Sequence, residues 1–320
     1  MKIVFMERDT LGSDVSLSKF EALGEVVYYS ESDSDENADR VKDADIIVVN
    51  KIPMNEATLS KAENLKLICL TATGTNNVDF DYVNKRNIVV ENVSGYSTES
   101  VVQHTFAMLL FLYEHIQYYD SYVKYGAYEK SESFTHFGYK YNELNGKTWG
   151  IIGLGTIGKR VAEVAQAFGC NVIYYSTSGK NNNSNYKRVT LEELLAQSDV
   201  ITIHCPLNEA TKNLISTREF AQMKKSAFIL NLGRGGIVDE QALFDALVHE
   251  DIAGAGLDVL KKEPIDESNP LYAFKDSNRL LITPHQGWGS QEARQRCADE
   301  TYENIVAYLN GTFRNRVIGG

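Results

Sequence analysis

The sequence has few cysteines and little positive charge, and each shortage excludes a class of protein. Its four cysteines (Cys69, Cys170, Cys205 and Cys297) include no C-x-x-C pair, which argues against a zinc site and indicates a reducing compartment. Lysine and arginine number 32 against 43 aspartates and glutamates, a net charge of −11. Binding to nucleic acid or to a membrane surface needs a basic face, so we expect neither.

Long apolar stretches are also missing. The longest apolar run, residues 106–113, is too short to cross a bilayer, and the first residues lack the apolar segment of a secretory signal. The chain has 320 residues, of which 43% are apolar and 23% charged, a composition that predicts about two globular domains. We therefore expect a soluble, acidic and cytoplasmic protein of two domains.

Short apolar runs alternate with helical stretches along the whole chain. In the first hundred residues they predict strands at 3–5, 26–29, 46–49, 67–70 and 88–90. A second series predicts strands at 148–152, 172–175, 200–204, 227–231, 256–259 and 281–283. Because these runs are continuously apolar, we expect strands buried on both faces, in parallel sheets that helices cover on each side.

A glycine-rich turn stands between the first strand of the second series and a predicted helix. Gly153, Gly155 and Gly158 have the spacing G-x-G-x-x-G, and strand–turn–helix is the context that this motif needs for dinucleotide binding. The first glycine makes the turn, the second lets the backbone approach a pyrophosphate, and the third packs helix on strand. The alternative is a turn of the same kind in a fold that binds no cofactor.

The position of this motif in mid-chain predicts the domain organisation. The fold class is α/β, with two Rossmann-like doubly wound parallel-sheet domains. A flavodoxin-like substrate domain takes residues 1–100 and 286–320, and an NAD(P)-binding Rossmann domain, residues 101–285, is inserted in it. A long amphipathic helix from Ser97 to about Tyr119 makes the first crossing between domains.

The segment after the second strand of this domain bears on the cofactor. An acid there would bind the adenosine ribose of NAD, but no aspartate or glutamate occurs between Ser176 and Arg188, whereas Lys180, Lys187 and Arg188 do. Hydroxyl groups and a lysine can hold a 2′-phosphate. We therefore favour NADP(H), with NAD(H) in a neutral site as the alternative. The residues expected to make this choice are Ser176, Thr177, Ser178 and Lys180.

Three residues suited to catalysis follow carboxyl ends of predicted strands, the edge where open α/β sheets bind ligands. They are Arg234, then Glu263 shortly after Asp258, and His285. An arginine can clamp a carboxylate through two hydrogen bonds, and a histidine oriented by a carboxylate is a suitable general acid at neutral pH. Each alone could be structural, but together they predict an active site. No histidines have metal-ligand spacing, so we expect no metal.

These residues together resemble the D-isomer-specific 2-hydroxyacid dehydrogenase family over essentially the whole chain. The matching segments are 71–79, 153–158, 231–239, 254–264 and 284–285. The resemblance implies an enzyme that reduces a 2-oxoacid to the (R)-2-hydroxyacid by hydride transfer from NADH or NADPH. It implies His285 as the acid/base and Glu263 as its support. Arg234 and the backbone N–H groups of Thr73 and Gly74 would bind the substrate carboxylate.

The resemblance also implies the cofactor contacts and the assembly. Asp258 would meet the nicotinamide end. The other cofactor-binding positions are Gly153, Gly155, Thr156, Ile157, Gly158, Ser176, Cys205, Pro206, Thr211, Leu232, Gly233 and Gly287. A homodimer is expected, with the apolar face of residues 97–119 as a contact.

Within the family, residues 71–74, 95–101 and 285–288 look most like glycerate dehydrogenases, also called hydroxypyruvate reductases. Hydroxypyruvate and glyoxylate are therefore the favoured substrates. One alternative is a broader D-2-hydroxyacid dehydrogenase of the D-lactate, phenyllactate or 2-hydroxyisocaproate type. The other is a non-enzymatic, nucleotide-sensing protein like the corepressors of this fold. Gln286 and Gly287 depart from the small apolar residues commoner after the histidine.

Overall fold

The computed structural model describes residues 1–31 and 33–318, and the chain divides into two compact units. Unit 1 comprises Met1–Ser97 and Trp288–Gly320, and unit 2 comprises Thr98–Gly287. Residues 32, 319 and 320 belong to ranges predicted for the first domain and lie outside the described residues. In the part of the chain that is described, no helix combines the length and apolar character needed to cross a membrane.

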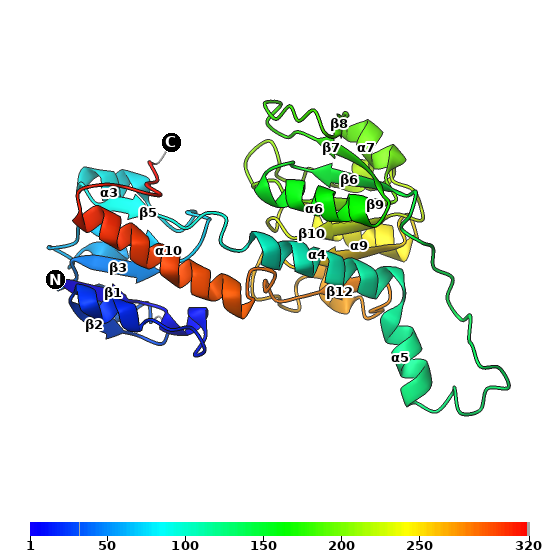
Figure 1. The fold of residues 1–320 in the computed structure, drawn as a ribbon, viewed down its shortest axis with the longest axis horizontal. Helices are drawn as coiled ribbons and strands as arrows, with labels where there is room; N and C mark the ends of the chain where they lie inside the picture. Colours follow the sequence, from blue (N-terminus) through cyan, green and yellow to red (C-terminus); the bar gives the residue numbers. More distant parts are fainter. Residues whose placement is uncertain (32, 319–320) are drawn as a thin grey trace. The chain divides into compact units, whose positions relative to one another are not determined.

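Unit 1 is built on a five-stranded parallel sheet in the order β2-β1-β3-β4-β5 (Figure 1). This is the flavodoxin-like strand order, so the fold predicted for this part is confirmed. The strands are β1 (Lys2–Phe5), β2 (Glu25–Tyr28), β3 (Ile46–Val49), β4 (Leu67–Leu70) and β5 (Val89–Glu91). Every residue of β3 and β4 is buried, because helical segments cover both faces of the sheet.

The helical segments of unit 1 are mostly short, and the last one is long. They are η1 (Arg8–Leu11), η2 (Ser18–Leu23), α1 (Asn37–Arg40), α2 (Glu56–Leu59), α3 (Phe80–Lys85) and α10 (Gln291–Leu309). Ser290 caps α10 by accepting a hydrogen bond from the N–H of Ala293. Ala298 and Ile305 of α10 pack in one core with Phe5 and Phe20, so the end of the chain completes the first unit.

Unit 2 is built on a seven-stranded parallel sheet in the order β12-β11-β10-β9-β6-β7-β8. Counted from β6, this is the Rossmann order with one further strand, and the strand order reverses between β6 and β9. The strands are β6 (Thr148–Ile152), β7 (Asn171–Tyr175), β8 (Lys187–Arg188), β9 (Val200–Ile203), β10 (Phe228–Asn231), β11 (Gly254–Leu257) and β12 (Leu280–Ile282). The predicted doubly wound fold is confirmed here too.

Helices cover both faces of this second sheet (Figure 1). They are α4 (Thr98–Tyr113), α5 (Ile116–Lys124), α6 (Thr156–Ala167), α7 (Leu191–Gln197), α8 (Thr217–Phe220), α9 (Glu240–Val248) and η3 (Pro270–Ala273). Phe106 and Leu109 of α4 and Val161 of α6 pack around Trp149 in one core. A separate core on the other face includes side chains of α7, α8 and α9.

Three details of the sequence prediction are wrong. The helix expected from Ser97 to Tyr119 is two helices, because His115 takes a left-handed conformation with φ of 52° and ends the first. Strand β11 ends at Leu257 rather than at residue 259, although residues 259–260 remain buried in the turn that follows. The apolar face of α4 packs in the core of its own unit, so it is not the predicted subunit contact.

Candidate active site

The turn that presents Arg234 is shaped by Asn231, a buried residue that ends β10. Asn231 Oδ1 accepts a hydrogen bond from the N–H of Gly233 at 3.0 Å, and its Nδ2 donates to the carbonyl of Arg234 at 2.9 Å. One guanidinium nitrogen of Arg234 donates to the carbonyl of Gly233 at 2.9 Å. The half-buried arginine is thus held at the carboxyl edge of the sheet with further N–H groups available for a ligand.

His285 and Glu263 form a direct pair at the same edge of the sheet. Nδ1 of His285 lies 2.7 Å from Oε2 of Glu263, and Oε1 of Glu263 accepts the N–H of Leu260 at 2.9 Å. Because an ionised carboxylate only accepts hydrogen bonds, the proton between the two groups belongs to Nδ1, and Nε2 is left to face a ligand. The carboxylate therefore fixes both the orientation of the ring and the nitrogen that can exchange a proton.

The Arg234 turn and the Glu263 turn pack against each other. A Cβ added to Gly235 would overlap the carbonyl of Leu260, the residue whose N–H Glu263 binds. Gly235 thus permits a close main-chain approach that a side chain would prevent. Arg234, Glu263 and His285, predicted from their places after strands, lie on neighbouring turns of unit 2.

Asp258, just beyond β11, is buried and holds the turn that follows His285. Its Oδ1 accepts the N–H of Gln286 at 2.9 Å, and its Oδ2 accepts the N–H of Gly287 at 2.8 Å. His285 itself has φ of 50°, a left-handed conformation that costs a non-glycine residue roughly 1–2 kcal/mol. The two main-chain bonds from Asp258 stabilise this turn, so Asp258 positions His285.

Thr283 and His104 complete the surroundings of the Asp258 carboxylate. Thr283 Oγ1 donates to Oδ1 of Asp258 at 2.7 Å, and since a hydroxyl has one proton, His104 Nε2 is the donor across its 3.0 Å contact with Thr283. Burial opposes ionisation of Asp258, but hydrogen bonds from His104, Thr283 and the main chain outweigh it and hold the pKa of the carboxyl below its usual value. The sequence offered no signal for His104, because only tertiary structure brings it to Thr283, 179 positions away.

The glycine-rich turn before α6 leaves a cradle at the helix N-terminus. A Cβ on Gly153, which has φ of 94°, would lie 2.7 Å from the nitrogen of Cys205, and one on Gly158 would overlap the carbonyl of Gly153. A Cβ on Gly155, by contrast, would meet no atom within 4 Å. Gly155 is the N-cap of α6 and provides no side-chain cap, so the first N–H groups of the helix are open to an anion. The residues present therefore fit a dinucleotide pyrophosphate.

Replacing Gly155 with alanine is expected to weaken cofactor binding at least tenfold and to leave thermal stability unchanged. The new methyl group would occupy the space that a pyrophosphate needs, but it would touch no protein atom. Isothermal titration with NADPH and NADH checks the affinity. The matched variant Gly158→Ala should instead lower the melting temperature, because its methyl group would overlap the carbonyl of Gly153. Unchanged affinity in Gly155→Ala would contradict the assignment of this cradle.

The residues predicted to choose the cofactor follow β7. Ser176 is buried and its Oγ accepts the N–H of Asn181 at 3.3 Å, while the Asn181 side chain donates to the carbonyl of Leu154 within the glycine-rich turn. Thr177 is half-buried and Lys180 is exposed. This segment is thus tied to the glycine-rich turn rather than extending freely from the sheet.

Other predicted cofactor positions lie on the turns after β9 and β10. Cys205 and Leu232 are buried. Thr211 is buried too, and its hydroxyl donates to the carbonyl of Pro206 at 2.7 Å, so this side chain holds the turn that carries Pro206. The ring nitrogens of His204 are enclosed beside them with no hydrogen-bond partner among the described residues, and burial lowers the pKa of this side chain to about 3, so it is neutral at pH 7.

In unit 1, the predicted substrate-binding loop follows β4. The hydroxyl of Thr73 donates to the carbonyl of Val93 at 2.8 Å, and Asn92 Nδ2 donates to the carbonyl of Thr73 at 2.7 Å. No group among the described residues accepts the N–H of Thr73 or Gly74. The loop is therefore braced with two main-chain donors free, the arrangement that a carboxylate ligand requires.

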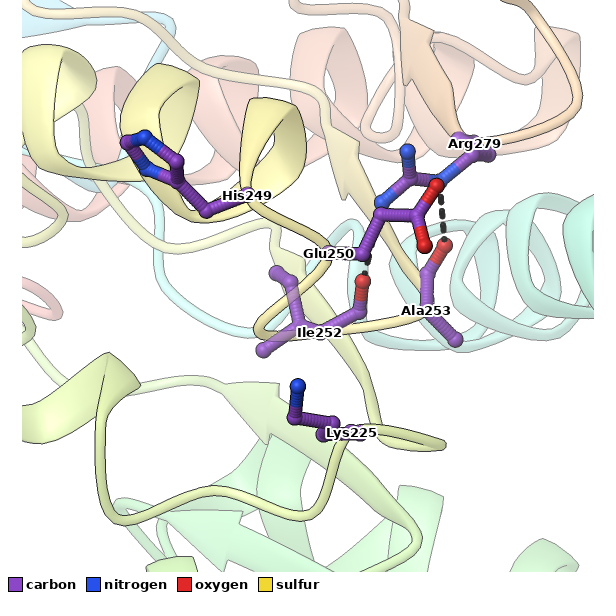
Figure 2. Close-up of a pocket in the computed structure, with 6 residues that line it drawn as sticks. All are labelled: Lys225, His249, Glu250, Ile252, Ala253 and Arg279. Atoms are coloured by element: carbon purple, nitrogen blue, oxygen red, sulfur yellow. Dashed lines mark hydrogen bonds between the residues drawn. The ribbon is translucent and has the colours of Figure 1, made fainter.

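A pocket of about 410 Å³ in unit 2 lies elsewhere. Figure 2 shows it lined by side chains just before β10, β11 and β12, at the amino ends of the strands, and therefore at the sheet edge opposite His285. Arg279 there donates to the carbonyls of Ala253 and Ile252 at 3.2 and 3.1 Å. These bonds give Arg279 a structural role. Among the described residues, no group of three or more His, Cys, Asp or Glu side chains is placed to hold a metal ion.

Comparison with known proteins connects this geometry to a chemistry. A family model described as the NAD binding domain of D-isomer specific 2-hydroxyacid dehydrogenase matches residues 106–287. The chain is 39% identical over 319 residues to a hydroxypyruvate reductase from Blautia hydrogenotrophica, covering 98% of each protein.

Two solved structures share the whole fold. A D-lactate dehydrogenase from Aquifex aeolicus, complexed with NAD and lactic acid, matches with a TM-score of 0.86 and 29% identity over 99% of both chains. An acyclic imino acid reductase in complex with NADPH and D-Arg matches with a TM-score of 0.87 and 31% identity, covering 99% of this chain and 100% of the other. One of these two similar structures thus holds NAD and the other NADPH.

Proposed function

Because this chain belongs to the D-isomer-specific 2-hydroxyacid dehydrogenase family, an NAD(P)-dependent oxidoreductase family, we propose that it reduces hydroxypyruvate and glyoxylate with NADPH. The observation that carries the catalytic assignment is the 2.7 Å pair of His285 and Glu263 beside the Arg234 turn. Two likenesses support the assignment of the substrate. Residues 71–74, 95–101 and 285–288 of this chain resemble those of glycerate dehydrogenases, and the whole chain is similar to a hydroxypyruvate reductase.

His285 is the acid in this proposal. A reduced nicotinamide supplies the hydride that C2 of the 2-oxoacid accepts. His285, protonated on both nitrogens, donates the Nε2 proton to the oxygen on C2, and Glu263 holds Nδ1 throughout. The Glu263 carboxylate also stabilises the imidazolium of His285 before the proton leaves, as the carboxylate that orients a catalytic histidine does in other enzymes.

Arg234 binds the substrate. Its guanidinium group can hold a carboxylate through two parallel hydrogen bonds and place a third donor near the C2 oxygen. In this proposal the free N–H groups of Thr73 and Gly74 also bind the substrate carboxylate, as the resemblance implies. Unit 1 then acts as the substrate domain and unit 2 as the dinucleotide-binding domain.

The cofactor preference rests on charge. The molecule has a net charge of −11, which disfavours an anionic cofactor, but the stretch from Ser176 to Arg188 has no acid and three basic residues. This local excess of positive charge suits the additional phosphate of NADP(H). The cytoplasmic location stays a prediction from the sequence.

A substrate panel tests the function. Steady-state rates with NADPH and NADH should be measured for hydroxypyruvate, glyoxylate, pyruvate and phenylpyruvate. The proposal expects the highest kcat/KM with hydroxypyruvate or glyoxylate and NADPH. Preference for pyruvate or phenylpyruvate would instead assign a broader D-2-hydroxyacid dehydrogenase, and no oxidation with any oxoacid would favour a nucleotide-sensing role.

We also propose that the enzyme is a homodimer. In this proposal the subunit contact is formed by α5 and the residues after it rather than by α4. Figure 1 shows α5 and the loop that follows it extending away from the sheet of unit 2. No residue of α5 is buried, and Phe134 and Phe137 on the loop are 90% and 82% exposed. An exposed aromatic surface of this extent is typical of a protein interface.

Sedimentation velocity checks the assembly. The expected result is a species of twice the 35.8 kDa chain mass, converted to monomer when Phe134 and Phe137 are both changed to serine. The matched change Tyr272→Ser, at an exposed aromatic residue of η3, should leave the dimer intact. A wild-type monomer at micromolar concentration would contradict the proposal.

A further inference from the structure

We propose that Arg188, on the edge strand β8, binds the 2′-phosphate of NADP(H) together with Lys180. The inference rests on the proposed function and goes beyond it by assigning a phosphate-binding residue from a different strand. The residues predicted from the sequence all lie directly after β7. Arg188 lies eight positions beyond Lys180, and only the pairing of β8 with β7 brings it back to them (Figure 1).

The strand register sets the direction of Arg188. In the parallel pairing of β8 with β7, Arg188 is opposite Tyr174 and Lys187 is opposite Ile173. Paired residues on neighbouring strands share a face of the sheet. Tyr174 belongs to the core on the α6 side, whereas Ile173 belongs to the core on the α7 side. Arg188 is therefore on the face of α6 and its glycine-rich turn, and Lys187 is on the other.

The guanidinium group of Arg188 reaches the turn at the end of β7. Its Nη2 lies 3.8 Å from the place that a Cβ on Gly179 would take. Gly179 closes this turn by donating its N–H to the carbonyl of Ser176 at 3.1 Å. Arg188 is exposed, and its guanidinium group forms no hydrogen bond or ion pair within the described part of the chain, so the side-chain donors are available. Lys180 follows the turn directly and is exposed as well.

The segment between these two cations is held in place. The hydroxyl of Tyr174 accepts the N–H of Asn183 at 2.8 Å, and Asn181 binds both Ser176 and the carbonyl of Leu154 in the glycine-rich turn. These bonds fix the loop beside the end of β7, where the adenosine ribose of a dinucleotide binds in this fold. The two cations thus flank the place where a 2′-substituent would be.

The chemistry distinguishes the two cofactors. A 2′-phosphate is a dianion with three acceptor oxygens, which an arginine fork can bind bidentately. A 2′-hydroxyl offers Arg188 no negative charge. A hydrogen bond between charged groups changes affinity by about tenfold or more. The loss of Arg188 should therefore weaken the binding of the phosphorylated ligand alone.

The test compares Arg188→Gln with Lys187→Gln by isothermal titration. Both variants lose one positive charge at adjacent exposed positions, but on opposite faces of the strand. The probes are adenosine 2′,5′-bisphosphate and adenosine 5′-monophosphate, which differ only in the 2′-phosphate. We expect the wild type to bind the bisphosphate more tightly, Arg188→Gln to weaken the bisphosphate at least tenfold and the monophosphate less than twofold, and Lys187→Gln to change both less than twofold.

Three results would overturn the inference. Unchanged binding of the bisphosphate in Arg188→Gln would remove Arg188 from the site. Equal losses in both variants would show general attraction by charge rather than a built contact. A wild type that does not distinguish the two probes would overturn the inference and the NADP(H) preference together. Because these titrations need no turnover, they are independent of whether hydroxypyruvate is reduced.

Discussion

Replacing His285 with asparagine is expected to lower kcat with hydroxypyruvate by about 10²–10⁴-fold, the usual contribution of a positioned general acid. Asparagine cannot release a proton, but it tolerates the left-handed conformation that residue 285 adopts at φ of 50°. The backbone turn and its bonds to Asp258 should therefore survive. Steady-state assays with NADPH and hydroxypyruvate measure the decrease in kcat.

A second histidine provides the control for this prediction. His249, at the end of α9, is exposed and lines the pocket at the opposite edge of the sheet, so His249→Asn should retain full activity. NADPH affinity and melting temperature should match the wild type in both variants. Turnover by His285→Asn within threefold of the wild type would show that another group supplies the proton.

Replacing Arg234 with lysine is expected to lower kcat/KM by about 10²–10³-fold, as removal of an oxyanion donor does in other enzymes. Lysine keeps the positive charge but loses the planar fork, so it cannot bind the carboxylate bidentately and reach the C2 oxygen as well. Both KM and kcat should change, because the same group binds the substrate and stabilises the developing oxyanion.

The change from arginine to lysine can be matched elsewhere in unit 2. Arg218, exposed on α8, is not placed in any site, so Arg218→Lys should be kinetically silent. If Arg234→Lys loses less than threefold in kcat/KM, the guanidinium group does not bind the substrate. A loss confined to KM would restrict Arg234 to ground-state binding.

Most of the fold could be predicted because its strands are continuous apolar runs. The expected bounds of 46–49 and 67–70 are those of β3 and β4, since each run is flanked by polar residues and buried on both faces. Helix α10 begins at Gln291 because Ser290 caps its first turn. Family likeness and parallel strand order confirm the two doubly wound domains.

The details that the sequence did not predict depend on tertiary contacts. Strand β8 is two charged residues long and forms only because β7 offers a free edge. The break at His115 is a left-handed residue with no glycine to mark it.

The residues of the candidate site could be predicted from the sequence where they directly follow the ends of strands. Arg234, Glu263 and His285 could be selected in this way, because parallel strands bring their carboxyl ends to one edge. The role of Asp258 could not be predicted in this way, because its carboxylate accepts main-chain N–H groups 28 and 29 positions later in the chain. The carboxylate of Asp258 is enclosed by the turn that it holds, and the contact with the nicotinamide end that the resemblance implies stays a prediction.

The most direct test of the central claim is the identity of the product made from hydroxypyruvate. The purified chain should be incubated with hydroxypyruvate and NADPH, and the glycerate formed should be resolved by chiral chromatography. We expect stoichiometric oxidation of NADPH and (R)-glycerate as the product. Formation of (S)-glycerate, or no oxidation of NADPH or NADH, would contradict the account.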